Sequence, residues 1–229
     1  GLLKLRPELK TEVDSRVPTA CRQDIDFILN VEISCIYKRD GAVRKVHALV
    51  FAPDFDAVDA INAALAKIGN LKADGRPILG LDCRDLLDIV LNASPNAWLV
   101  PAHIWTPWFS MLGSKSGFDS VNECFGDLAG EVFAAETGLS SDIPMNRLVS
   151  SLDRLALISN SDAHSPANLG RNATIFHGDP DYLAIRQALK TQSPTDFGGT
   201  LDLFPEEGKY HLDGHRACNV CLEPQQSRE

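Results

Sequence analysis

Apolar residues along this chain alternate between short continuous runs and repeats at helical spacing. Residues 28–37 and 43–51 are rich in β-branched and aromatic side chains, and an Asp-Gly pair lies between them, which predicts two strands joined by a tight hairpin. Residues 55–68 carry apolar side chains at helical spacing, and residues 82–94 repeat this pattern behind an aspartate that can cap a helix. We therefore expect a hairpin followed by two amphipathic helices.

The same alternation continues to residue 204. Further helices are expected at 121–125, 147–152 and 182–189. Further strands are expected at 97–100, 132–135, 155–159, 173–176 and 200–204. Strands that alternate with helices indicate βαβ units and a mainly parallel sheet or barrel, so the predicted fold class is α/β. Beyond residue 204 the chain becomes polar and rich in turn residues, which divides it into a domain at 1–204 and a connecting segment at 205–229.

The composition fits one folded domain of ordinary type. The chain has 229 residues, of which 44% are apolar and 23% charged, values typical of a globular protein. No stretch approaches the roughly 20 apolar residues of a membrane span, and the N-terminus lacks the pattern of a secretory signal. We therefore expect a soluble, cytoplasmic protein without a membrane partner. Four cysteines are scattered without metal-like spacing and are expected to be reduced and structural: Cys21, Cys35, Cys83 and Cys124.

The net charge of −9 argues against a general affinity for nucleic acid, because binding a polyanion requires clustered lysine and arginine. Acidic metal ligands, however, count as negative in this sum and are neutralised once divalent ions bind. Basic positions remain, among them Lys115 and Arg171. The first residue is Gly1 and the last follows a Cys-x-x-Cys motif closely, so we interpret the chain as a fragment.

Ionisable residues stand where several apolar runs end. The run at 155–158 leads to Asp162 and His164, and the carboxyl end of a strand is where α/β folds hold their chemistry. Three other runs end likewise, and one histidine lies on a strand expected to pair with one of them. The full constellation is Glu32, His47, His103, Glu136, Asp162 and His164.

Carboxylate and imidazole groups bind zinc, manganese or iron, and two or three such ions can clamp a phosphate and activate water. Taken alone, each of these residues is better explained by a structural role, such as a hydrogen-bonded histidine or a glutamate paired with an arginine. Six of them at strands or strand ends change that balance, because burying so many ionisable groups without ions is costly. We therefore expect a hydrolase with a divalent metal centre.

The segment at 104–120 combines aromatic residues with a Gly/Ser/Lys stretch. Trp105, Trp108 and Phe109 could stack on an extruded base, and the stretch around Lys115 could approach phosphates. The alternative is an aromatic minicore under a long loop. The residues alone favour that alternative, since the stretch is not a P-loop.

Cys218 and Cys221 have the spacing of a zinc knuckle, but a structural zinc site needs four ligands. His211 and His215 could complete the site. We prefer a version in which a second Cys-x-x-Cys lies beyond residue 229, which leaves both histidines free for structure or substrate contact.

On six stretches the chain resembles the polymerase-and-histidinol-phosphatase (PHP) superfamily and, within it, the endonuclease Q family of repair nucleases. The stretches, which span nearly the whole chain, are 30–37, 45–53, 101–109, 136–142, 159–165 and 204–216. The resemblance implies a PHP-type distorted β/α barrel with two or three divalent ions, which are zinc, manganese or magnesium. The ligands that it implies are Glu32, His47, His103, Asp162 and His164, with Glu136 left open.

Three features of the family have no counterpart in this sequence. They are the opening His-x-His strand, the Gly-Asp-x-x-His-Pro segment after it, and the second half of the C-terminal zinc module. We therefore expect an incomplete barrel that lacks its first strand and several ligands, and that is inactive by itself. The start of a zinc module would follow at 205–229, with Cys218 and Cys221 as ligands of a structural zinc.

For the activity, the resemblance implies cleavage of the DNA phosphodiester on the 5′ side of uracil, hypoxanthine, xanthine or an abasic site, in DNA repair. Asp162, His164 and His103 would be catalytic together with the ions, and the damaged nucleotide would be flipped out of the duplex. The expected substrate contacts are Trp105, Trp108, Lys115, Arg171, His211 and His215. The partner is then DNA with damaged bases, and a sliding clamp or a helicase is left open as a second partner.

Two alternatives stay open. The first is a PHP-type phosphatase for a small phosphomonoester, which needs the same ions and no zinc knuckle. The second is a non-catalytic DNA-binding or scaffolding module that holds no ions.

Overall fold

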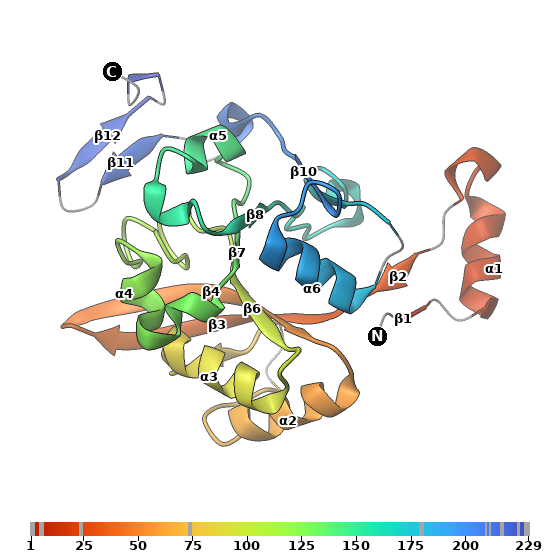
Figure 1. Cartoon of the computed structure of the whole chain (residues 1–229), viewed down its shortest axis with the longest axis horizontal. Coiled ribbons are helices and arrows are strands. Elements are labelled where there is room, and N and C mark those ends of the chain that lie inside the picture. Colours follow the sequence, from red (N-terminus) through yellow and green to blue (C-terminus); the bar gives the residue numbers. More distant parts are fainter. Residues whose placement is uncertain are drawn as a thin grey trace.

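The computed structural model describes residues 3–4, 7–22, 25–72, 75–178, 181–208, 210, 212–215, 218–223 and 225–226. A four-stranded sheet lies at its centre, in the order β5-β3-β4-β6. Helices cover one face of this sheet, and a second group of short strands lies beyond its other face (Figure 1). In the part of the chain that is described, no helix is long and apolar enough to cross a membrane.

The hairpin of β3 (Leu29–Arg39) and β4 (Ala42–Ala52) is the longest regular feature. The two strands pair antiparallel along their whole length, from Leu29 opposite Ala52 to Arg39 opposite Ala42. Both turn residues have a positive φ, 51° at Asp40 and 75° at Gly41. This is the conformation of a type I′ turn, which an Asp-Gly pair favours because its twist matches that of the strands. The predicted hairpin is confirmed.

Two shorter strands complete the central sheet. β6 (Trp98–Pro101) pairs antiparallel with β4, and β5 (Ile78–Leu79) pairs parallel with β3. The mainly parallel sheet predicted from the sequence is therefore wrong for this part of the chain. The physical reason is the hairpin, because a two-residue turn can only join antiparallel neighbours. The described residues form parallel ladders between β3 and β5 and between β7 and β8, and no closed barrel is formed among them.

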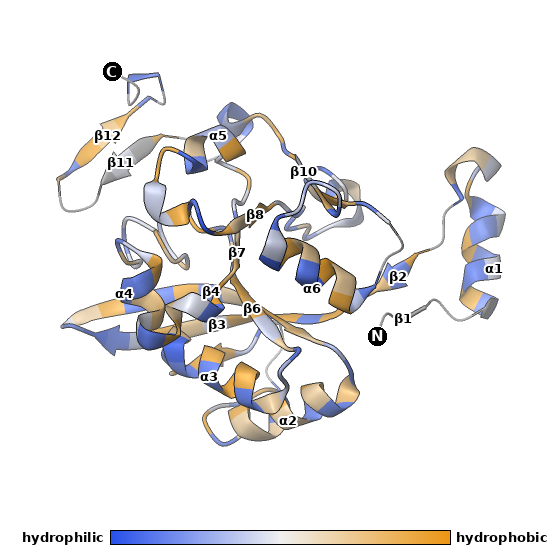
Figure 2. Cartoon of the chain, in the orientation of Figure 1, coloured by the Kyte–Doolittle hydropathy of each residue, from blue (hydrophilic) through white to orange (hydrophobic). Residues whose placement is uncertain are grey.

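Helices α2 (Phe55–Leu65), α3 (Cys83–Ala93) and α4 (Val121–Phe125) lie against one face of the sheet. Aspartates cap the first two, since Asp54 accepts the N–H of Ala57 and Asp82 accepts the N–H of Arg84, both at 2.8 Å. Figure 2 shows hydrophobic residues on the central strands and on α2 and α3, whereas α1 (Pro7–Arg16) is mostly hydrophilic. The buried core between these layers includes Ile33, Cys35, Val46, Ala48, Ile61, Leu65, Leu86, Leu87 and Val90.

A second apolar cluster fills the opposite side. Its strands are β7 (Ala134–Glu136) and β8 (Ala156–Ile158), which pair parallel, and β9 (Ala173–Phe176) and β10 (Phe197–Leu201), which pair antiparallel. Helix α6 (Tyr182–Thr191) covers them. The rings of Phe51 and Trp98 stack with centroids 4.0 Å apart and join this cluster to the central sheet. The sheet therefore has an apolar layer on each side.

Two predicted elements differ from the structure in position. The helix expected at 147–152 is replaced by α5 (Ile143–Asn146), followed by a 3₁₀ turn at Ser150–Leu152. Asp142 explains the earlier start, because its side chain accepts the N–H of Met145 and caps the helix. The strand expected at 200–204 is β10, which ends at Leu201 where its pairing with Ala173 ends.

The ends of the chain carry small elements apart from the core. β1 (Leu3–Lys4) pairs with β2 (Asp26–Phe27), and α1 lies to one side of the main body. At the other end, β11 (Asp213–His215) and β12 (Val220–Leu222) form an antiparallel hairpin.

Candidate metal centre

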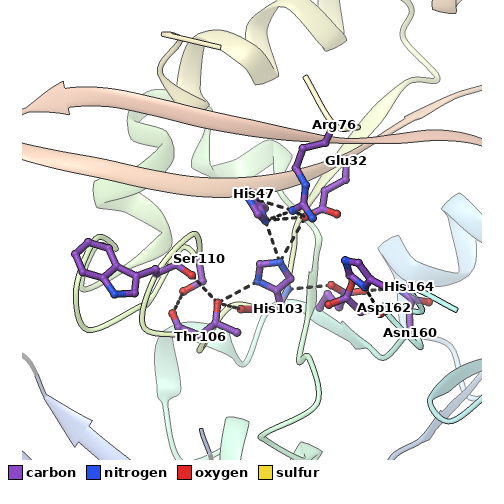
Figure 3. A network of polar contacts seen from close by, with 11 residues as sticks. Glu32, His47, Arg76, His103, Thr106, Ser110, Asn160, Asp162 and His164 are labelled. Carbon is purple, nitrogen blue, oxygen red and sulfur yellow. Dashed lines mark hydrogen bonds and ion pairs between the residues drawn. The ribbon is translucent and has the colours of Figure 1, made fainter. Parts of the chain in front are cut away.

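Three ligand-type side chains converge on one face of the central sheet (Figure 3). His47 on β4 pairs with Ser34 on β3, and Glu32 lies two residues before Ser34 on the same face of that strand. The Nδ1 atom of His47 is 2.7 Å from Oε1 of Glu32. His103, just after β6, brings its Nε2 atom to 3.2 Å from His47 Nδ1 and 3.5 Å from Glu32 Oε1. One ligand atom from each residue lies within 4.8 Å of the others.

The backbone at His103 has an unusual conformation. His103 has a φ of 30°, in the left-handed region that few residues other than glycine adopt. Gly138 lies directly against it, and a Cβ added to Gly138 would come within 2.9 Å of the Cβ of His103. The hydroxyl of Thr106 is 3.2 Å from Nδ1 of His103. These contacts leave Nε2 of the ring to face Glu32 and His47.

Glu136, the last residue of β7, holds the backbone of His103 in place. Its side chain is buried, and one carboxylate oxygen accepts the backbone N–H of His103 at 2.9 Å. The other oxygen accepts the side-chain amide of Asn160 at 2.7 Å. Burial raises the pKa of the Glu136 carboxyl. Glu136 therefore positions His103 and Asn160, and its predicted role as a metal ligand stays a prediction.

The charges of the cluster favour the forms that bind metal. Burial raises the pKa of Glu32, but hydrogen bonds from His103 and His47 and the charge of Arg76 outweigh it and hold that pKa well below its ordinary range. Burial lowers the pKa of His47, and the nearby Arg76 adds to this effect although Glu32 opposes it. An ionised carboxylate and a neutral imidazole are the ligand forms of these groups.

His103 behaves differently from His47. Burial lowers the pKa of His103, but its hydrogen bond to Glu32 and the negative charges of Glu136, Glu32 and Asp162 outweigh burial, so the pKa is raised. The negative charge that raises it is also the charge that attracts a divalent cation. One carboxylate and two imidazoles are a donor set for zinc or manganese, so the residues fit a divalent ion.

Asp162 and His164 lie apart from this cluster. Their side chains are 37% and 72% exposed, and Asp162 has a φ of 43°. Nδ1 of His164 lies 3.0 Å from the backbone oxygen of Asp162 and 3.8 Å from its carboxylate. In Figure 3 both lie to the right of His103 and below Glu32, and Asp162 lines the same cavity as these two residues. The structure thus brings three of the six predicted residues into one cluster, and the roles of the other three stay predictions.

The loop of Asp162 is held by hydrogen bonds to its backbone. Arg171 donates to the carbonyl oxygens of Ser161 at 2.7 Å and of Asp162 at 3.2 Å. The hydroxyl of Ser161 donates to the carbonyl of Asn172 at 3.0 Å. Arg171, predicted as a substrate contact, therefore has a positioning role in the structure, and its contact with substrate stays a prediction.

A cavity of about 710 Å³ opens beside the cluster, a size typical of ligand pockets. Its polar wall includes Glu32, His103, Glu136, Asn160 and Asp162. Its apolar wall includes Leu49, Phe51, Trp98, Ile158, Phe176 and Leu189. Glu32 and His103 of the cluster therefore face a space that can admit a planar apolar group together with a charged one.

The aromatic residues of the following loop have different environments. Trp105 is half-buried against the core, and its indole N–H donates to Asn146 at 2.7 Å. Trp108 is 49% exposed, and the ammonium of Lys45 lies 5.0 Å from its ring centroid. Lys115 is also exposed. Trp105 lies in a minicore of the kind weighed from the sequence, whereas Trp108 has a face available to a base, and both DNA contacts stay predictions.

Two residues of the site were missed by the sequence analysis. Asn160 is the partner of Glu136 described above, and Arg76 contacts both Glu32 and His47. Asn160 lies two residues before Asp162, so its position after an apolar run was a usable signal. Arg76 lies in a turn between Gly75 and Pro77, and nothing in the local pattern indicates its partner.

The predicted zinc module is described only in part. Cys218 and Cys221 are exposed, free thiols on the β11–β12 hairpin. His211 and the side chain of His215 lie outside the described residues. The zinc ligands and the two histidine contacts to substrate therefore stay predictions.

No family model matches the chain. Among curated proteins, it is 31% identical over 188 residues to the uncharacterized protein YqxK of Bacillus subtilis (strain 168). The aligned region covers 80% of this chain and 46% of that protein. It is also 35% identical over 126 residues to the uncharacterized protein MJ0043 of Methanocaldococcus jannaschii. This second alignment covers 51% of this chain and 14% of that protein. The chain thus spans less than half the length of these relatives.

Among solved structures the similarity is to nucleases. The lesion-specific endonuclease PfuEndoQ from Pyrococcus furiosus matches with a TM-score of 0.71 and 27% identity, over 97% of this chain and 55% of that one. Endonuclease Q in complex with a 27-mer duplex that has an abasic lesion at the active site matches with a TM-score of 0.71 and 28% identity, over 89% of this chain and 49% of that one. The chain therefore resembles endonuclease Q, as predicted from its sequence, and the PHP superfamily is consistent with this resemblance.

Proposed function

We propose that this protein is a metal-dependent endonuclease of DNA repair. It cleaves the phosphodiester on the 5′ side of a deaminated base (uracil, hypoxanthine or xanthine) or of an abasic site. The observation that carries the proposal is the cluster of Glu32, His47 and His103 beside an open cavity. It occurs in a chain similar to an endonuclease Q that was solved with an abasic duplex.

The residues of the cluster would hold two or three divalent ions. When bound, such ions supply Lewis acidity to the phosphoryl group and lower the pKa of coordinated water. Glu32, His47 and His103 are the ligands closest together, and Asp162 and His164 would complete the set from the 159–165 loop, where Asp162 lines the same cavity as Glu32 and His103. Glu136 holds the backbone of His103, so the imidazole keeps one orientation while the substrate enters.

The cavity suits a nucleotide that has left the base stack. Its apolar wall, formed in part by Phe51, Trp98 and Phe176, would shield the base, while Glu32 and His103 face the phosphate side. Flipping is easiest for a mispaired, deaminated or missing base, because less pairing energy is lost. Trp108, with Lys45 above its ring, would stack on a neighbouring base at the rim.

The test is cleavage of a labelled duplex that contains one uracil, with manganese or magnesium added, by the full-length protein and its Asp162→Asn variant. We expect a nick 5′ to the uracil and a rate at least about 100-fold lower in the variant, because a ligand or catalytic group is lost. Asp153→Asn, which changes an exposed aspartate away from the cavity, is the matched control and should cleave normally.

Two results would contradict the proposal. If the folded, metal-loaded protein leaves the uracil duplex intact but hydrolyses a chromogenic phosphomonoester, the small-molecule phosphatase is the correct alternative. If the purified protein holds metal far below one equivalent and still binds DNA, it is the non-catalytic module.

A further inference from the structure

The guanidinium of Arg76 lies among the metal ligands themselves (Figure 3). Its Nη1 atom is 2.5 Å from Oε1 of Glu32 and 2.5 Å from Nδ1 of His47. It is also 3.2 Å from Nε2 of His47. These are atoms that would bind an ion. In the structure, the guanidinium of Arg76 therefore takes the place of a metal cation beside Glu32 and His47.

The backbone explains why Arg76 is at this point. β5 pairs parallel with β3, with Ile78 opposite Ser34, and the N–H of Ser34 donates to the carbonyl of Pro77 at 2.9 Å. Arg76 lies two residues before Ile78, and Glu32 lies two residues before Ser34, so the chain enters β5 with Arg76 beside Glu32. The ring of Pro77 limits the backbone directly after Arg76. The position of Arg76 is therefore set by the strand pairing and is not a chance contact of a long surface side chain.

Arg76 and a divalent ion exclude each other at this position. Zinc binds nitrogen and oxygen ligands at about 2.0–2.2 Å, and Nη1 fills the space between Glu32 and His47. A guanidinium close to a divalent ion is also repelled by it. In contrast, the side chain of Glu32 is only 22% exposed, and leaving its charge without a cation would be costly. One cation or the other must therefore be present.

The guanidinium has a second set of donors. Among the described residues, the hydrogen bonds of this guanidinium to the cluster all involve Nη1, so Nε and Nη2 are not engaged by the cluster. The side chain is 31% exposed at the edge of the site. A planar pair of N–H donors matches two oxygens of a phosphate, which is why arginine is favoured for phosphate recognition.

We propose that Arg76 is a phosphate-binding residue that holds Glu32 and His47 while no ion is bound, and that turns its guanidinium to the substrate phosphate when an ion takes its place. This inference rests on the proposed function, which supplies the phosphodiester. It assigns to Arg76 opposite effects on two ligands: it weakens metal binding and strengthens phosphate binding.

The test measures those two effects separately on the metal-stripped, full-length protein. Mn²⁺ is titrated calorimetrically into the protein and its Arg76→Gln variant, and inorganic phosphate is then titrated in the presence of saturating Mg²⁺. We expect Arg76→Gln to bind Mn²⁺ about tenfold more tightly and phosphate about tenfold more weakly, because one nearby positive charge is removed. Arg76→Lys, which keeps the charge without the planar pair of donors, should change Mn²⁺ binding little and still weaken phosphate binding.

Arg84→Gln is the control, since Arg84 pairs with Asp127 on the surface and does not contact the cluster. It should change neither affinity. If Arg76→Gln binds both Mn²⁺ and phosphate more weakly, Arg76 has a structural role only and the proposal is overturned. The proposal is also overturned if Arg76→Gln changes neither affinity, or changes only one of them. Neither titration needs cleavage, so a protein that passes both tests but does not nick DNA would overturn the proposed function and leave the role of Arg76 intact.

Discussion

The cluster of Glu32, His47 and His103 and the loop of Asp162 and His164 are held by different kinds of structure. Two ligands of the cluster lie on an antiparallel ladder of two eleven-residue strands, and their side chains are 22% and 11% exposed. The loop is held by single side chains such as Arg171, and His164 is 72% exposed. Under the proposed function, the chain would preorganise a metal position at the cluster, and the loop of Asp162 and His164 would be completed only by an ion or substrate.

The largest effect should come from the cluster. Glu32→Gln removes the only carboxylate of the three-residue group, and a neutral amide is a weaker ligand for a divalent ion. We expect the affinity for Mn²⁺ to fall by about 100-fold or more, a loss at or above that seen when ligand-supporting residues are removed. Calorimetric titration of the metal-stripped protein measures this, with exposed Glu131→Gln as the matched control. Unchanged metal affinity would show that the cluster is not the tight site.

A smaller effect should come from the backbone that supports His103. Gly138 has a φ of 77°, and an added Cβ would lie 2.9 Å from the Cβ of His103. Gly138→Ala should therefore lower the free energy of unfolding by about 2 kcal/mol, the usual size of strain at such a position. Thermal or urea unfolding measures this difference.

Gly80→Ala provides the comparison for that experiment. Gly80 is exposed, and an added Cβ there meets nothing within 4 Å. Its stability should change by less than about 0.5 kcal/mol. Equal stabilities of the two alanine variants would mean that His103 is free to move, and the cluster would then be no more rigid than the loop.

The smallest effect should come from His164→Ala. His164 is exposed and does not belong to the cluster, so the first equivalent of Mn²⁺ should bind within about twofold of the wild-type affinity, as for an ordinary surface change. A later equivalent should bind more weakly or be lost. A large loss of affinity for the first equivalent would mean that the cluster and the loop of Asp162 and His164 bind this ion together.

The sequence predicted most of what depends on local pattern. The hairpin follows from its Asp-Gly turn, and α3 follows from its aspartate cap and apolar spacing. Because ligands at strands and strand ends meet at one side of a sheet, the meeting of Glu32, His47 and His103 could also be expected.

The sequence could not predict contacts that depend on pairing between distant segments of the chain. The parallel contact of β5 with β3, which brings Arg76 to Glu32, joins two residues of each strand and has no signal in either one. The different environments of the two tryptophans have no local signal either, since Trp105 contacts Asn146 far along the chain whereas Trp108 is exposed. Spacing alone gave these two tryptophans the same predicted role.

The β3–β4 hairpin also sets an order of assembly. Its contacts are local, and hairpins of this kind close within about 1–10 μs. We therefore expect Glu32 and His47 to meet early in folding, whereas His103, Arg76 and Asp162 arrive only after longer loops have closed at a greater entropic cost. A nascent chain would thus bring two of the candidate metal ligands together before the cavity beside them has formed.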